Sequence, residues 1–395
     1  MMVATAAMLV GTPAMSGDWS IQAVISNEAN FVDNRALNEN SKGISFGHIS
    51  NLELDFLYAM PDGSFNISTD LSSTHYLGDA ASGFKDQYLP HLGAEWIRKG
   101  RNDTITVFAD YRIQQLTLLD LIESTIILPE PIFIPVDTVR TTLSGGFNWS
   151  HNVDARDTLT FRNLINAKFF DTAPGIDDRT VANTLSWERK LTKRTIGTMS
   201  AGFDWVDIKD TTNTNRFIYR LNGKLTSQLS KRLTASVGAG VNLVDTVRDG
   251  SDPAPSITGA FNTNLTYSLK TTTLSWNADY GLAEGALGDI QNSFSTGVSV
   301  QHLINDRSSV NATAKISAGE GEFGEGLGSA YTFSFSPTYS LSLTDEWKLR
   351  AGYRFVYKDT GAVATDPKTG AITPVDPSKS STVFVTLTRA FTVLP

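Results

Sequence analysis

The stretch that decides the fold reads LTASVGAGVNL and runs from Leu233 to Leu243. Apolar side chains occupy its odd positions, and small or polar residues occupy its even ones. Successive side chains of a β-strand point to opposite sides of the sheet, so a period of two indicates a strand with two unlike faces. Residues 104–113, 275–282 and 347–355 repeat the pattern, although Phe108 interrupts the polar side of the first. Helical periodicity is scarce, and the sequence predicts an all-β chain.

Short polar turns punctuate these strands, and five of the seven spacings between them lie near 38 to 40 residues. Longer segments rich in Gly, Asp, Asn, Thr or Pro lie between the turns. The repeat is therefore strand, long loop, strand, short turn. A propeller blade of this length would hold four strands, whereas two strands of about 10 to 14 residues suit a membrane. The turns are Pro61-Asp62-Gly63, Gly100-Arg101-Asn102, Asp154-Ala155-Arg156, Thr192-Lys193-Arg194, Ser230-Lys231-Arg232, Lys270-Thr271, Asn305-Asp306-Arg307 and Thr344-Asp345-Glu346.

Alternating strands with short turns at one end and long loops at the other are typical of a transmembrane β-barrel. In lipid every backbone N–H and C=O needs a partner, and a closed barrel leaves no sheet edge. Eight short turns, with both chain ends on their side, predict 18 strands, within a range of 16 to 18. The predicted fold is a single antiparallel up-and-down barrel with short periplasmic turns, long extracellular loops and a bacterial outer-membrane location.

Aromatic residues near the strand ends support this fold, because membrane barrels carry aromatic girdles at the two interfaces. The predicted girdle residues are Trp96, Trp149, Trp187, Trp205, Tyr58, Tyr76, Tyr267 and Tyr357.

Composition narrows the function. The 395 residues include 33 Lys and Arg against 41 Asp and Glu, so no basic excess suggests nucleic acid as a partner. Cysteine is absent, which excludes disulfides, thiolate metal sites and cysteine nucleophiles. Residues 1–16 resemble an export signal that ends at a small-x-small site, Ala14-x-Ser16, although no Lys or Arg precedes the apolar run. We therefore expect residues 17–395 to form the barrel.

Two motifs resemble outer-membrane barrels associated with exopolysaccharide biosynthesis and secretion loci. One is Asn27-Glu28-Ala29-Asn30-Phe31-Val32-Asp33-Asn34, which resembles the first strand of that family, and the other is Gly352-Tyr353-Arg354-Phe355 followed by a last strand that closes on Phe391. The tail after Phe391 departs from that family, whose assembly signal ends on the aromatic residue. The resemblance implies an outer-membrane address and an exopolysaccharide-associated role.

The alternation places charged residues on the polar face, which would line the lumen. Like-signed rings of side chains set pore selectivity, so a mildly basic interior predicts a preference for anions or acidic glycans. Alternatively, the charges pair across neighbouring strands and stiffen or plug the lumen. The basic members are Arg112, Arg162, Lys168, Arg220, Lys224, Lys315, Lys348, Arg350 and Arg354, and the acidic members are Asp55, Asp110, Asp204 and Asp279, with Glu53, Asp70 and Glu95 beside them.

The predicted loops contain the remaining acidic residues and one apolar segment. The acidic residues predicted in loops and turns are Asp171, Asp177, Asp178, Asp249, Asp252, Glu320, Glu322 and Glu325. None of these segments matches an EF-hand, so no metal is expected. The segment 122–136 is apolar for a loop, and it could constrict the pore or contact a partner. Its candidate residues are Ile126, Ile127, Leu128, Pro129, Ile132 and Phe133.

Signatures of enzymes are absent: the chain has no Gly-x-Ser-x-Gly and no His-Glu-x-x-His. We therefore expect no enzymatic activity and no cofactor. Three functions remain: a channel-type barrel associated with exopolysaccharide export, a passive diffusion porin for small anionic solutes, and a non-conducting structural or surface-interaction barrel. The expected partners are outer-membrane lipid, lipopolysaccharide or exopolysaccharide, a second copy of the chain or another envelope protein.

Overall fold

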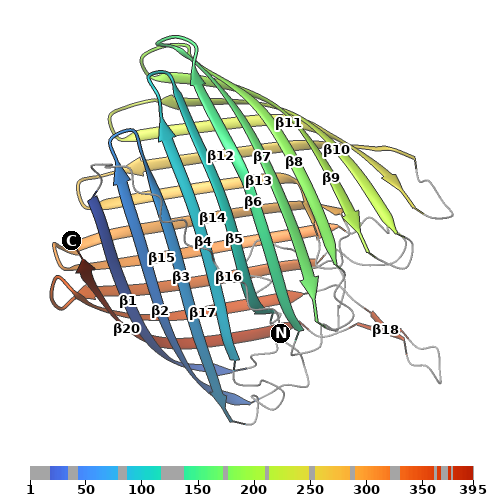
Figure 1. Cartoon of the computed structure of the whole chain (residues 1–395). Coiled ribbons are helices and arrows are strands. Elements are labelled where there is room, and N and C mark those ends of the chain that lie inside the picture. The colour runs from blue at the N-terminus through green and yellow to red at the C-terminus, as the bar shows by residue number, and fades with distance from the viewer. Residues whose placement is uncertain are drawn as a thin grey trace.

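A computed structural model describes residues 18–33, 43–78, 87–116, 138–171, 177–209, 213–248, 254–284, 290–320, 330–359, 363–365, 372–374 and 377–394. Eighteen long antiparallel strands form one closed sheet (Figure 1). The prediction of an all-β barrel of 18 strands is confirmed. No helix long and apolar enough to cross a bilayer occurs in the part of the chain that the structure describes.

The barrel strands are β1 (Asp18–Asp33), β2 (Ile44–Met60), β3 (Gly63–Leu77), β4 (Gln87–Lys99), β5 (Asp103–Leu116), β6 (Thr138–Asn152), β7 (Asp157–Phe170), β8 (Asp178–Lys190), β9 (Thr195–Ile208), β10 (Thr214–Gln228), β11 (Leu233–Val247), β12 (Ser256–Ser268), β13 (Thr272–Glu284), β14 (Ile290–Asn305), β15 (Ser308–Glu320), β16 (Ala330–Ser342), β17 (Trp347–Asp359) and β20 (Ser378–Leu394). Between β17 and β20, the short strands β18 (Val363–Thr365) and β19 (Ile372–Pro374) pair only with each other.

Closure of the barrel depends on β1, which pairs with β2 on one side and with β20 on the other. Val24 lies opposite Glu53 in β2 and opposite Ala390 in β20. Every long strand therefore has two neighbours, and the sheet has no open edge. This arrangement satisfies the backbone hydrogen bonds that lipid cannot satisfy.

All eight predicted turns join consecutive strands, and they gather at one end of the barrel in Figure 1. Four of them share one device, in which a side-chain oxygen accepts the backbone N–H groups two and three residues later. In the β6–β7 turn, Asp154 Oδ1 accepts the amides of Arg156 at 2.6 Å and Asp157 at 2.8 Å. The hydroxyls of Thr192, Ser230 and Thr344 do the same in their own turns. Such side-chain caps favour tight turns.

The aromatic girdle follows the prediction with one correction. At the short-turn end, Trp149 Nε1 donates to Asp103 and Trp187 Nε1 donates to Asp157, so each indole is anchored to a neighbouring strand. Tyr76 is the exception. Its position in the register of β3 turns it inward, and its ring lies against Gly47, where an added Cβ would come within 2.3 Å of it. A strand end alone does not reveal the face, because one residue of shift reverses it.

Candidate functional site

The two faces of the barrel wall differ in packing and polarity. On β10 and β11, Leu221, Leu225 and Val241 are about half exposed, whereas Arg216 and Asn242 on the opposite face are almost completely buried. Side chains inside a closed barrel converge and shield one another, whereas those outside diverge toward lipid. The polar face is therefore the inner face, and the strand register transfers this assignment from strand to strand around the barrel.

The register places the side chains of all thirteen predicted lining residues on this inner face. Asp55 lies on β2; Asp110 and Arg112 on β5; Arg162 and Lys168 on β7; Asp204 on β9; Arg220 and Lys224 on β10; Asp279 on β13; Lys315 on β15; Lys348, Arg350 and Arg354 on β17. Their part in conduction remains a prediction. The inner face also carries Phe108, so its aromatic ring, which interrupts the polar pattern, points into the lumen.

Carboxylates concentrate on the inner face of β1 to β5. Glu53 lies directly opposite Asp70 across β2 and β3, an arrangement of like charges that opposes pairing. Asp70 lies opposite His91, which contacts Asp110 of β5, and the guanidinium of Arg112 comes within 3.4 Å of the same ring nitrogen. The acidic members of this arc are Glu28, Glu53, Asp55, Asp70, Glu95 and Asp110.

On β7 to β10, cations and carboxylates of neighbouring strands form ion pairs. Lys168 Nζ lies 3.2 Å from Asp178 Oδ2, and Arg220 contacts Asp204. Both carboxylates are only 4% exposed, so the pairs are part of the packed wall rather than of the water-filled space. These four residues are called the paired wall below. The prediction that Asp178 lies in a loop is wrong, because it is the first residue of β8.

The inner face of β17 differs, because the residues that lie opposite its cations in the register of β16 and β20 are uncharged. Lys348, Arg350, Arg354 and Lys358 follow one another along the strand, and they are called the β17 row below. Every inward residue of β16 that pairs with β17 is Ser or Thr, and on β20 only Phe384 departs from that rule. Within these described strands, no carboxylate faces the row.

The aromatic ring of Phe384 contacts two members of the β17 row, Arg350 and Arg354. Its register partner is Gly352, where an added Cβ would lie 2.4 Å from the ring, so the missing side chain leaves room for the ring over the strand. The guanidinium of Arg350 lies 5.6 Å from the ring centroid and that of Arg354 lies 6.0 Å from it. Cation–π contacts of this length are attractive and restrain the arginines. Phe384 was not among the predicted lining residues, although its even position in an alternating strand places it on the inner face.

From β11 to β16 the inner face is nearly uncharged, with Asp279 and Lys315 as the predicted charged members. Asp279 lies opposite Ser295, and Lys315 lies opposite Gly297 and Ser334. The lumen is therefore divided around its circumference into acidic, paired, neutral and basic sectors. Further charges that the sequence analysis missed are Glu28, Arg140, Arg216 and Lys358, which lie near strand ends beyond the stretches with clear alternation.

Several predicted features lie outside the described residues. They include the export signal and the apolar loop with Ile126, Ile127, Leu128, Pro129, Ile132 and Phe133. Of the acidic loop residues, Asp249, Asp252, Glu322 and Glu325 also lie outside, whereas Glu320 is the last residue of β15. Within the described ranges, no group of three or more His, Asp or Glu residues is arranged to hold a metal ion.

No protein-family model and no curated protein matches the chain. Solved structures share its fold. OpdO of Pseudomonas aeruginosa has a TM-score of 0.51 and 10% identity over 95% of this chain and 98% of that chain. OpdL of the same organism has a TM-score of 0.51 and 12% identity over 95% and 99%. The FrpB iron transporter of Neisseria meningitidis, as the F5-1 apoprotein, has a TM-score of 0.53 and 9% identity over 95% and 81%.

Identities this low establish the fold alone. They support the predicted resemblance at the level of an outer-membrane barrel and provide no link to exopolysaccharide. The chain is a β-barrel of the bacterial outer membrane, with the same fold as an established iron transporter.

Proposed function

We propose that the barrel is a channel for small anionic solutes, carboxylates in particular. The observation that carries this proposal is the β17 row, four cations on the inner face of one strand that lie opposite uncharged residues in the register of β16 and β20. Barrels of 16 to 18 strands leave an aqueous channel, so a row of this kind can act on a passing ion. Guanidinium groups bind carboxylates through two parallel hydrogen bonds, which favours carboxylates over spherical anions.

The sectors explain why an acidic protein could prefer anions. Carboxylates of the paired wall are neutralised by adjacent cations, and those of the acidic arc lie on strands β1 to β5. An anion that follows β17 meets a positive wall with Ser and Thr hydroxyls on both sides. The restraint of Arg350 and Arg354 by Phe384 reduces the conformational entropy that they would lose on binding a solute.

The test is the current through single refolded barrels in a planar bilayer, with the reversal potential measured across a salt gradient. A unit charge about 8 Å from a permeating ion in water changes its energy by roughly 0.5 kcal/mol. Removing two cations with Arg350→Gln and Arg354→Gln changes the energies of an anion and a cation by about 1 kcal/mol each in opposite directions, so the anion-to-cation permeability ratio should fall about thirtyfold. The matched control, Lys168→Gln with Asp178→Asn, removes a pair with no net charge and should leave the ratio unchanged. A folded barrel without conductance would overturn the proposal and favour a structural barrel.

A second candidate is passage of an acidic exopolysaccharide chain, which the resemblance of the sequence implies. The observation that favours it is the length of the β17 row. From Lys348 to Lys358, the row extends about 33 Å along the strand at 3.3 Å per residue, enough to follow several units of a carboxylated polymer. Oligouronates of increasing length separate the two candidates. Blockade times that grow with length would support the polymer, and blockade independent of length would support small solutes.

A further inference from the structure

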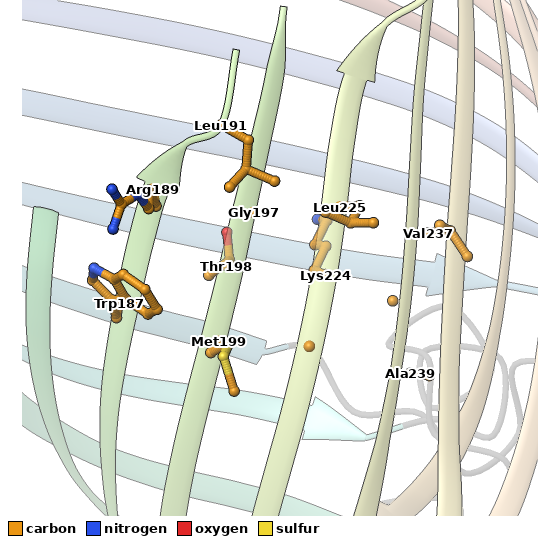
Figure 2. Close-up of a pocket in the computed structure, with 12 residues that line it drawn as sticks. Trp187, Arg189, Leu191, Gly197, Thr198, Met199, Lys224, Leu225, Val237 and Ala239 are labelled. Atoms are coloured by element: carbon orange, nitrogen blue, oxygen red, sulfur yellow. The ribbon is translucent and has the colours of Figure 1, made fainter. Parts of the chain in front are cut away.

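An apolar hollow lies on the outer face of the barrel near the short-turn end, across β8 to β11 (Figure 2). Its volume is about 480 Å³. Figure 2 shows Trp187 and Arg189 on one side and Leu225 and Val237 on the other, with Leu191 and Met199 between them. The lumen and its charges play no part in this feature, because these side chains lie on the lipid-facing side of their strands.

The register explains why the wall is hollowed here. Across β8 to β11, one line of register partners consists of Trp187, Met199, Gly223 and Ala239. The next outward-facing line toward the short turns consists of Arg189, Gly197, Leu225 and Val237. Small residues thus form the floor and large ones the rim. An added Cβ at Gly223 would meet no atom within 4 Å, whereas one at Gly197 would lie 3.2 Å from Leu191. The hollow is deepest at Gly223.

Cations surround the short-turn side of the hollow. They lie at the end of β8 and in the β8–β9 and β10–β11 turns, and all are exposed. The guanidinium of Arg189 also lies 5.9 Å from the ring centroid of Trp187, at the level where girdle tryptophans meet lipid headgroups. One carboxylate, Asp157 on β7, lies beside this rim, 3.9 Å from Arg189 and within hydrogen-bond distance of the Trp187 indole, whereas Glu188 faces the lumen. The cations are Arg189, Lys193, Arg194, Lys231 and Arg232, whereas Lys190 lies on the lumen face of β8.

We propose that this site binds one anionic phospholipid of the periplasmic leaflet, with an acyl chain over Gly223 and the phosphate among the turn cations. An apolar hollow next to a basic rim matches the two ends of such a lipid, and basic residues close to the membrane surface attract anionic headgroups. A zwitterionic phospholipid matches the hollow only. A second barrel would bring the same five cations close to another copy of the site, which opposes self-association through this face.

Native mass spectrometry of the refolded full chain tests the proposal, with phosphatidylglycerol or phosphatidylcholine added to the detergent solution. We expect one phosphatidylglycerol to be retained and phosphatidylcholine to be retained at least fivefold less, since each basic residue near a membrane surface contributes about fivefold to binding of anionic lipid. Lys231→Gln with Arg232→Gln should lower retention of phosphatidylglycerol and leave that of phosphatidylcholine unchanged.

Gly223→Leu should fill the hollow and abolish retention. Its control is Gly259→Leu on the outer face of β12, where an added Cβ also meets no atom within 4 Å. Equal retention by the two glycine variants would overturn the proposal. So would a dimer of the wild-type chain that Gly223→Leu dissociates, because a second copy would then be the occupant. The charge variant leaves the hollow intact and gives an answer even if Gly223→Leu does not fold.

Discussion

The paired wall and the β17 row carry similar cations on the same inner surface, yet the structure gives these cations different surroundings. Lys168 and Arg220 each contact a buried carboxylate on the next strand. Arg350 and Arg354 instead lie beside an aromatic ring, among Ser and Thr. A pair of opposite charges has little field at a distance, whereas a row of one sign acts on any ion in the lumen. A count of lining charges therefore does not predict ion selectivity unless the residues opposite each charge on the neighbouring strands are known.

Charge reversal on β17 should have the largest effect. Arg350→Glu with Arg354→Glu replaces two cations by two anions on a strand whose register partners are uncharged. We expect the reversal potential to change sign, from anion preference to cation preference, at low ionic strength. Raising the salt to 1 M should shrink the difference from the wild type, because the Debye length then falls to about 3 Å. Unchanged selectivity would show that permeating ions do not approach this sector.

Removing the carboxylate from one ion pair of the paired wall should leave a cation on the inner face that acts on permeating ions, as the cations of the β17 row do. Asp204→Asn leaves Arg220 without its carboxylate and should raise the anion-to-cation permeability ratio about sixfold, because one charge shifts the energies of anion and cation in opposite directions. It should also lower the free energy of unfolding by about 1 kcal/mol, since the partly exposed guanidinium of Arg220 loses its charged partner. The double variant Asp204→Asn with Arg220→Gln should restore the wild-type ratio. If it does not, the pair has a role beyond mutual neutralisation.

The contribution of Phe384 should be smaller. Phe384→Leu keeps an apolar side chain over Gly352 but removes the π face, and with it about 0.5 to 1 kcal/mol for each cation–π contact. Arg350 and Arg354 should then become more mobile, which predicts a two- to fivefold weaker block of the current by a dicarboxylate. Phe108→Leu on β5 is the control, because it also removes an inward aromatic ring. If the two variants weaken the block by the dicarboxylate equally, the contacts of Phe384 with Arg350 and Arg354 have no particular role in binding.

The smallest effect concerns a charge outside the membrane wall. Hydrogen bonds from the backbone N–H groups of Arg156 and Asp157 lower the pKa of the Asp154 carboxyl. The ionised form is therefore the one that stabilises the turn, and its contribution is present above the ordinary pKa of an aspartate and lost as the pH falls through the lowered value. Asp154→Ser reproduces the Ser230 turn with a neutral acceptor, so urea unfolding between pH 2 and 5 should lose this part of its pH dependence. Identical pH profiles of the wild type and the variant would contradict the assignment.

Much of this architecture could be predicted from the sequence, because lipid imposes it on every strand. All eight predicted turns join consecutive strands. Four of them contain a residue that caps tight turns, namely Asp154, Thr192, Ser230 and Thr344. Tyr76 was assigned to the wrong face, because the alternation near the end of β3 mixes polar and aromatic residues on both sides. Asp178 was assigned to a loop, because acidic and glycine-rich residues just before it hide the start of β8.

For the lumen site, the sequence predicts which side of the wall each charged residue faces but not which residues it contacts. The alternation placed Arg220 and Asp204 on the polar side, but pairing between them depends on the register of β9 against β10, which no single strand reveals. The stack of Phe384 with Arg350 and Arg354 likewise joins strands separated by a long connection. Such contacts depend on which strand closes against which, and the sequence alone did not contain this information in readable form.

The four capped turns have a consequence for how such a barrel can change over time. Each cap closes its own hairpin with residues of that hairpin alone, at Asp154, Thr192, Ser230 and Thr344. A duplication or loss of one such unit adds or removes two strands. Because two is an even number, every other strand keeps its direction and every side chain keeps its side of the wall. The bore could therefore widen or narrow in whole hairpins while the solute-facing chemistry of the remaining wall stays in place.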